Sequence, residues 1–266
     1  MYAYLIPTVI LGLIFGSFFN VVIYRTPIAL EAKLQGKKNS SLLKQLSWPA
    51  SFCPGCTNKI SWLDNIPVFS WLLLGGKCRQ CKISIKVRYV IVELISALIF
   101  SYCYLKFGLS YGAVYWIVLF SLLLVLFFID AETFFLPDIF TIPLIFLALA
   151  GSFLEMTNTV FVDSLIGGAT GFLILYIINL FYKIVRKVDG FGGGDFKLLA
   201  GLGALFGWAS LPMILGMSSI LGLVYILMPT GFNRRKIKLN TMVPFGPFLI
   251  LSSLFMYANS YAINLF

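Results

Sequence analysis

Long apolar runs recur along this chain, and they constrain its fold more than any other feature. About 20 consecutive apolar residues are enough to cross the hydrocarbon core of a bilayer. Of the 266 residues, 60% are hydrophobic and 11% are charged, whereas soluble domains carry roughly 25% charged residues. Too few polar residues are therefore present to cover a soluble core. Because lipid leaves backbone groups no partner except one another, the runs predict an all-α polytopic membrane protein.

We expect about eight transmembrane helices, over residues 3–24, 89–106, 111–130, 137–154, 160–182, 195–209, 211–229 and 242–264. The sixth run is short, and it abuts the seventh at Ser210 to Pro212. Gly12 and Gly16 give the first run a GxxxG face, which predicts close packing against another helix.

The placement of lysine and arginine indicates how these helices are oriented, because basic residues concentrate in cytoplasmic loops. With eight spans and both termini outside, Lys106 is the one residue among the 20 basic residues that lies outside. The net charge of +10 then reflects topology and contact with anionic lipid head groups. No nucleic-acid partner is needed to explain it.

A polar, basic insert, residues 26–88, separates the first two expected spans. Its prolines and the Gly75-Gly76 pair predict small hairpins and turns. The insert contains two C-x2-C knuckles separated by 21 residues, with Cys53, Cys56, Cys78 and Cys81. Two knuckles can enclose Zn²⁺ in four thiolates, and this closed shell predicts a structural, zinc-ribbon-like site. Two disulfides or four free thiols are the alternatives, although disulfides are rare in the reducing cytoplasm.

The carboxylates suggest a chemistry that needs no histidine, and the chain has none. Its absence excludes Ser-His-Asp and Cys-His hydrolysis and the HExxH metalloproteases. Asp130 ends an apolar run and Asp195 follows Gly192, Gly193 and Gly194, so we expect both near the cytoplasmic boundary. Two neighbouring carboxylates in low dielectric share one proton, so one can activate water while the other protonates a leaving amide. The glycines would let a substrate approach the backbone. The alternative is that both aspartates are helix caps facing water.

At these residues the chain resembles the type IV prepilin peptidases, which belong to the GxGD class of aspartyl proteases. The resemblance covers nearly the whole chain. It is carried by GSFFNVVIYRTP (16–27), the CPGC and CRQC knuckles, ISIKVRYVIVE (83–93), IDAETFFLPD (129–138), GFGGGDFKLLAGLGALFGW (190–208) and VPFGPFL (243–249). The block at 83–93 differs from the family pattern at Val90, where a proline is usual.

The resemblance implies that Asp130 and Asp195 form the catalytic pair, with Asp138 as an alternative member. It also implies a set of residues that shape the cleft or contact the substrate: Gly192, Gly193, Gly194, Glu132, Asp138, Asp189, Lys197, Pro244, Gly246 and Pro247. The expected domains are a first transmembrane helix, a cysteine loop associated with methylation and a peptidase core, over residues 1–25, 26–88 and 89–266.

The activity that the resemblance implies has two steps in the bacterial inner membrane. The leader of a prepilin or pseudopilin is cleaved at the cytoplasmic boundary, and the new N-terminus is then methylated from S-adenosylmethionine. The alternatives are a peptidase without methylation, a secondary transporter and a membrane scaffold. A transporter would also place carboxylates and broken helices at functional depth. A cysteine insert and acids gathered at one face favour the enzyme.

Overall fold

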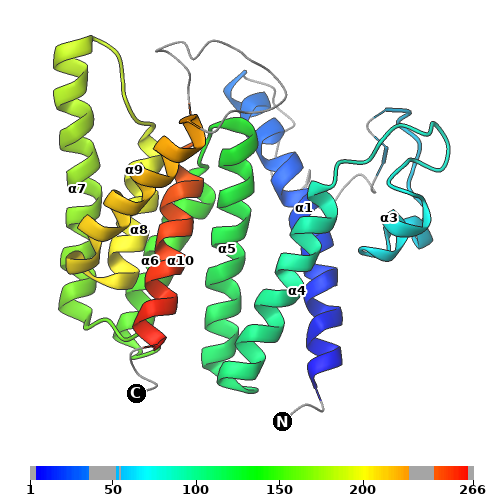
Figure 1. Ribbon diagram of the computed structural model, residues 1–266, viewed down its shortest axis with the longest axis horizontal. Helices are drawn as coiled ribbons and strands as arrows, with labels where there is room; N and C mark the ends of the chain where they lie inside the picture. The colour runs from blue at the N-terminus through cyan, green and yellow to red at the C-terminus, as the bar shows by residue number, and fades with distance from the viewer. Residues whose placement is uncertain (1–3, 36–51, 54, 228–242, 263–266) are drawn as a thin grey trace. The chain divides into compact units, whose positions relative to one another are not determined.

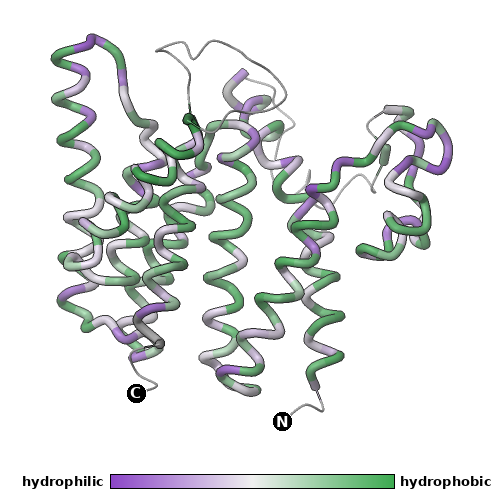
Figure 2. The backbone as a smooth tube through the Cα atoms, in the orientation of Figure 1, coloured by the Kyte–Doolittle hydropathy of each residue, from purple (hydrophilic) through white to green (hydrophobic). Residues whose placement is uncertain are grey.

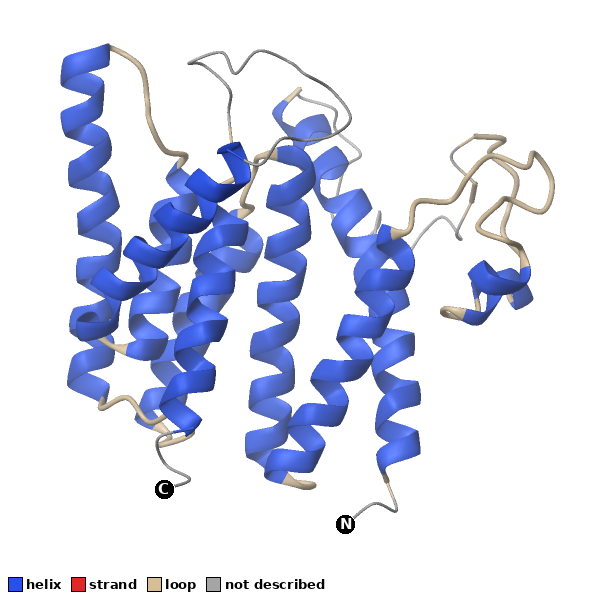
Figure 3. Ribbon diagram, viewed as in Figure 1, coloured by secondary structure: helices blue, strands red, loops and turns tan. Residues whose placement is uncertain are grey.

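The computed structural model describes residues 4–35, 52–53, 55–227 and 243–262. Within these ranges the chain is helical, with two isolated antiparallel bridges and no strand ladder (Figure 3). The chain divides into two compact units, Met1–Val125 and Leu126–Phe266.

The first unit contains α1 (Leu5–Leu34), η1 (Leu63–Asn65), α3 (Phe69–Leu73), α4 (Arg88–Phe107) and most of α5 (Tyr111–Thr133) (Figure 1). The second unit contains the end of α5 and then α6 (Asp138–Phe153), α7 (Phe161–Arg186), α8 (Gly193–Phe206), η2 (Trp208–Ser210), α9 (Leu211–Leu227) and α10 (Gly246–Ala262).

Each expected apolar run overlaps one of these helices, so the all-helical prediction is confirmed for the described part of the chain. The expected end of the first span at residue 24 is wrong, because α1 continues without a break through Pro27 to Leu34, inside the expected insert. Within residues 4–35, 55–227 and 243–262, five segments are long and apolar enough to cross a membrane, namely α1, α4, α5, α7 and η2 with α9. Three shorter helices of the second unit, α6, α8 and α10, have 16, 14 and 17 residues. Apolar residues dominate the long helices in Figure 2. Large apolar side chains such as Phe181, which is 69% exposed, lie on the outside of α7, as lipid contact requires.

The GxxxG face of α1 packs against α4. A Cβ atom built on Gly12 would lie 2.6 Å from the Cα of Ala97, and one on Gly16 would lie 2.6 Å from the Cα of Glu93. Real Cβ atoms do not approach so closely, so glycine is required at both positions. The predicted close packing of the first span is therefore confirmed, and its partner is α4.

Helix α8 is the buried centre of the second unit. It packs against α6, α7 and α10, and Leu198, Leu199 and Leu202 on it are fully buried. A Cβ on Gly167 of α7 would overlap the carbonyl oxygen of Gly203, so the two backbones touch directly. Because α8 is enclosed by other helices, its 14 residues do not have to match the thickness of a bilayer.

Candidate active site and cysteine cluster

Asp130 lies in the last turn of α5 and is only 4% exposed. Its Oδ2 accepts a hydrogen bond of 2.9 Å from the N–H of Gly246, the first residue of α10. The first N–H groups of a helix have no partner within the helix, and they favour an anion. A Cβ on residue 246 would lie 2.7 Å from the same Oδ2, so glycine is needed for this contact.

Asp195 is the third residue of α8, and its side chain is fixed by the turn that precedes it. The N–H of Gly192 donates to Oδ2 of Asp195 at 3.0 Å, and the N–H of Asp195 donates to the carbonyl of Gly192 at 3.0 Å. The side chain is half-buried, while Gly192 and Gly193 are exposed. The carboxylate is thus held at the start of the helix beside accessible backbone.

Leu136, in the loop between α5 and α6, lies between the two aspartate-bearing helix ends. A Cβ on Gly194 would lie 2.5 Å from the Cβ of Leu136, and a Cβ on Gly246 would lie 3.3 Å from its Cδ1. The two carboxylates are near enough to interact electrostatically. Segments that carry Asp130, Asp195 and Gly246 therefore converge on one place within the second unit.

The three glycines before Asp195 have different surroundings. Gly194 is pressed against Leu136, whereas a Cβ on Gly193 would meet nothing within 4 Å. A Cβ on Gly192 would meet only the carboxylate of Asp195, at 3.3 Å. Packing therefore requires glycine at position 194 and leaves position 193 open.

The other candidate residues near the pair form two ion pairs. Lys197 of α8 donates to Asp138 at the start of α6, with 2.6 Å between Nζ and Oδ1. Asp189 pairs with Lys183 at 3.0 Å. Hydrogen bonds from Lys183 and Asn179 hold the pKa of Asp189 below its usual range.

The remaining candidates lie at the ends of α5 and α10. Glu132 is exposed in the last turn of α5, Pro244 is half-buried before α10, and Pro247 is buried in its first turn.

Two contacts that the sequence reasoning missed hold the glycine loop in place. Oδ1 of Asn179 in α7 accepts hydrogen bonds from the N–H groups of Gly190 and Phe191, at 2.7 and 3.0 Å. The ring of Phe191 packs edge-to-face against Phe245, with 5.3 Å between centroids. An asparagine within an apolar helix is the one signal that could have indicated the first contact, because a polar group in lipid needs a partner.

The two cysteine knuckles have the same local structure. In the first, the N–H of Cys53 donates to Asn58 and the carbonyl of Cys53 accepts from Thr57. In the second, Cys78 makes the same two bonds with Ile83 and Lys82. Thr57 and Lys82 both have positive φ, at 56° and 59°. An antiparallel bridge joins the residues on either side of each turn, Phe52 with Lys59 and Lys77 with Ser84. The predicted small hairpins are therefore present.

The four knuckle sulfurs, Cys53, Cys56, Cys78 and Cys81, all lie within 4.8 Å of one another. The Sγ atoms of Cys53 and Cys81 are 3.7 Å apart. Thiolates around a tetrahedral metal with bonds of about 2.3 Å would be separated by about 3.8 Å. Backbone N–H groups of Cys81 and Gln80 lower the pKa of Cys78 to about 6, which favours the thiolate at this sulfur, whereas burial and the three neighbouring thiols raise the pKa of Cys81 to about 11. The cluster therefore suits a tetrahedral metal ion.

Comparison with known proteins assigns both parts of the chain. Residues 10–107 match the Bacterial Peptidase A24 N-terminal domain, and residues 117–227 match the Type IV leader peptidase family. A protein from Pectobacterium carotovorum named prepilin leader peptidase/N-methyltransferase is 39% identical, with 92% of this chain and 90% of the relative covered. Proteins with the same name from Pseudomonas aeruginosa and Vibrio cholerae are 37% and 34% identical, covering 94% and 96% of this chain and 88% and 97% of the relatives. No solved structure matches the chain. The chain belongs to the type IV leader peptidase family.

Proposed function

We propose that this chain is a bifunctional membrane enzyme that removes the leader peptide from type IV prepilins or pseudopilins and N-methylates the new N-terminus. The relatives that cover nearly the whole chain carry both activities in their names. The observation that supports the peptidase chemistry best is the convergence of Asp130 and Asp195, each bonded to one backbone N–H. We assign these two aspartates as the catalytic pair.

The reaction requires the pair to hold one proton between them. The ionised carboxylate removes a proton from water, and the oxygen attacks the carbonyl carbon of the scissile bond. The protonated partner then donates its proton to the leaving nitrogen as the carbon–nitrogen bond breaks. The Gly246 N–H bond to Asp130 and the Gly192 N–H bond to Asp195 keep both side chains in position while this proton moves.

The substrate would lie against the exposed backbone of Gly192 and Gly193. Side chains at these positions would separate an extended chain from the carboxylates. We assign the Lys197–Asp138 pair to the wall of this cleft, because it joins the starts of α6 and α8 beside Asp195. Glu132, Asp189, Pro244 and Pro247 are assigned to the rim and to substrate contacts.

In the membrane we infer eight spans with both termini outside. The site and the cysteine loop then lie on the cytoplasmic side of the bacterial inner membrane, where the basic residues meet anionic lipid. We assign residues 26–88 to methylation and residues 89–266 to the peptidase core. Zn²⁺ held by the four cysteines would fix the two knuckles together, and S-adenosylmethionine supplies the methyl group when it is bound.

The test is a cleavage assay with the purified full chain in detergent and a model prepilin, read by mass spectrometry. Asp130→Asn and Asp195→Asn should each abolish cleavage, and Glu155→Gln, an exposed acid elsewhere in the second unit, should not. A methyl mass on the product of the wild type separates the bifunctional enzyme from a peptidase alone. Cleavage by either asparagine variant at the wild-type rate would overturn the assignment of that aspartate.

A further inference from the structure

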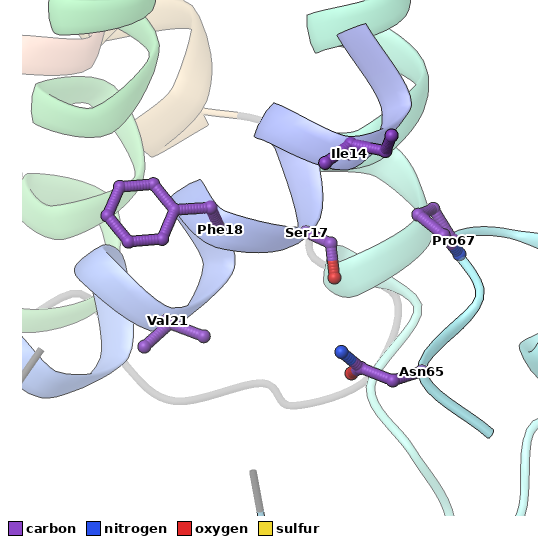
Figure 4. Close-up of a pocket in the computed structure, with 6 residues that line it drawn as sticks. All are labelled: Ile14, Ser17, Phe18, Val21, Asn65 and Pro67. Atoms are coloured by element: carbon purple, nitrogen blue, oxygen red, sulfur yellow. The ribbon is translucent and has the colours of Figure 1, made fainter. Parts of the chain in front are cut away.

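A second site lies in the first unit, between one face of α1 and the segment that runs from the end of η1 to Pro67. It is a pocket of about 270 Å³ lined by Ile14, Ser17, Phe18, Val21, Asn65 and Pro67 (Figure 4). The four α1 residues occupy positions i, i+3, i+4 and i+7, so they share one face of the helix. Four of the six lining residues are apolar, and the polar side chains are those of Ser17 and Asn65.

A buried carboxylate lies next to Ser17, one of the two polar residues that line this pocket. Glu93 of α4 is 7% exposed. Its Oε2 accepts the N–H of Val68 at 2.8 Å, and its carboxylate also accepts a hydrogen bond from the hydroxyl of Ser17. The close approach of α1 and α4 at Gly16 is what places Ser17 beside Glu93. The carboxyl group of Glu93 is therefore connected to the pocket through the hydroxyl group of Ser17.

The backbone at the pocket is strained to make this arrangement. Val68 has φ of 61°, a conformation that is rare for a β-branched residue and costs on the order of 1–3 kcal/mol. The N–H of this residue is the one that donates to Glu93. Strain of this kind persists where surrounding contacts enforce it, and it is common at binding sites.

The other two acidic residues of the first unit are not available for such a role. Glu31 is exposed near the end of α1. Asp64 is bonded to Arg79, with 2.7 Å between Oδ1 and Nη2. Glu93 is thus the one acidic residue of Met1–Val125 that is both buried and next to a cavity.

We propose that this pocket binds the methyl acceptor, that is, the free α-amino group of the cleaved substrate together with its first, apolar side chain. The inference rests on the proposed function, which requires a place for the new N-terminus during methylation. Ser17 and Asn65 contact the ammonium group, Glu93 neutralises its charge through Ser17, and Ile14, Phe18 and Val21 surround the side chain.

The chemistry explains why a carboxylate is needed at this point. An ammonium nitrogen has no free electron pair, so it must lose one proton before it can attack. Glu93 takes this proton by way of the Ser17 hydroxyl. The amine nitrogen then forms a bond to the methyl carbon of a sulfonium donor, the carbon–sulfur bond breaks, and its electron pair stays on sulfur. The product is a charged secondary amine.

The size of the pocket favours the acceptor over the donor. A volume of about 270 Å³ lies below the roughly 300–1,000 Å³ of typical sites for drug-sized ligands. An amine with one side chain fits such a space, whereas a nucleoside joined to an amino acid is larger. Ile14 and Phe18 are also 53% and 48% exposed, so an apolar chain in the bilayer can reach the pocket along α1.

The test measures binding to the full-length, zinc-loaded protein in lipid nanodiscs. The probe is a labelled synthetic peptide with a free α-amine and an N-terminal phenylalanine, and its N-acetylated form serves as the uncharged comparison. The wild type should bind the free amine about tenfold more tightly, because a charge-assisted contact is lost on acetylation. Ser17→Ala and Glu93→Gln should each bring the free-amine peptide to the affinity of the acetylated one.

Controls distinguish this site from a structural effect and from failure of the proposed function. Ser101→Ala removes a hydroxyl of α4 that bonds to its own helix at Ala97, so it should not change peptide affinity. Equal binding of the two peptides by the wild type would overturn the acceptor site. The site would also be overturned if Glu93→Gln bound the peptide as tightly as the wild type does but bound S-adenosylhomocysteine more weakly. If Glu93→Gln does not fold, Ser17→Ala decides alone. Wild-type protein that cleaves a prepilin but never methylates it would instead contradict the proposed function.

Discussion

The cysteine cluster and the aspartate pair are built in opposite ways. Each knuckle is a turn of six residues closed by its own backbone hydrogen bonds, as Cys53 to Asn58 and Cys78 to Ile83 show. In the aspartate site only Asp195 has such a local frame, because the N–H that binds Asp130 comes from a residue 116 positions later in the chain. The cysteine cluster therefore depends on turn chemistry, and the aspartate pair depends on how several helices pack.

The largest effect is expected when either member of the aspartate pair is substituted. Asp130→Asn or Asp195→Asn should reduce the rate of cleavage by about 10³-fold or more, because general acid–base groups contribute about 10²–10⁴-fold. Neither change should release the metal from the knuckles, which share no residues with the pair. Single-turnover cleavage and metal content measured on the same samples check both statements. Metal loss in either variant would show that the two sites are not independent.

The next effect tests whether packing, and not glycine content, builds the aspartate site. Gly194→Ala should reduce cleavage by about 10²-fold, because small displacements at a catalytic site are costly and its Cβ would lie 2.5 Å from Leu136. Gly216→Ala in α9 is the control, since a Cβ at this position would meet nothing within 4 Å. Its initial rate should stay within about threefold of the wild type. Similar losses in both variants would contradict the close-packing explanation.

A smaller effect is expected when the hydrogen bonds that hold the glycine loop are removed. Asn179→Leu deprives the N–H groups of Gly190 and Phe191 of their acceptor. Cleavage should fall by about tenfold, as one or two net hydrogen bonds are worth about 1 kcal/mol each. Hydrogen exchange should increase at the amides of Gly190 and Phe191. If these amides exchange as slowly as in the wild type, another group holds the loop.

Removal of the metal tests whether the cysteine region affects the peptidase site. Cys78→Ser should abolish stoichiometric metal binding and increase proteolysis within residues 52–86, while cleavage of a prepilin changes by less than about threefold. Structural thiolate sites contribute folding energy directly, so the effect should be confined to the segment they enclose. Elemental analysis, limited proteolysis and the cleavage assay are the three measurements. A matched loss of cleavage would mean that the knuckles support the peptidase.

The smallest effect concerns the ion pair beside the second knuckle. The hydrogen bond from Arg79 holds the pKa of Asp64 below its usual range. A carboxylate with a lowered pKa stabilises the fold above its unfolded pKa, and this contribution is lost as the pH falls through the folded value. Because the Arg79 side chain is 66% exposed and water screens the pair, Asp64→Asn should change metal release by less than about twofold at neutral pH. Metal release followed from pH 7 to pH 3 checks this, and a larger change would give the pair a role in metal retention.

The sequence predicted the parts of the molecule that depend on local pattern. Apolar runs indicated the helices because a backbone surrounded by lipid must form its hydrogen bonds within its own segment. The C-x2-C spacing indicated the sulfur cluster, because the ligands of each knuckle are three residues apart. Gly12 and Gly16 indicated a close helix contact, although they could not name α4 as the partner.

The contacts around the aspartates could not be predicted in the same way. Nothing in the string Gly192-Gly193-Gly194 distinguishes the position that touches Leu136 from the one that faces open space. The role of Glu93 was also missed, because its partner Val68 lies 25 positions away and adopts a strained φ. Such contacts arise only when helices distant in sequence are packed together.

The hydrogen bond from α10 to Asp130 also sets a time at which the enzyme can begin to work. A ribosome that has just added Asp130 must add another 116 residues before Gly246 exists, which at about 5–20 residues per second takes on the order of ten seconds. Until then Asp130 has neither its N–H donor nor, for part of that interval, its partner Asp195. A chain that is released early, or that loses its last helix, therefore carries both aspartates and still lacks the donor that holds one of them in place.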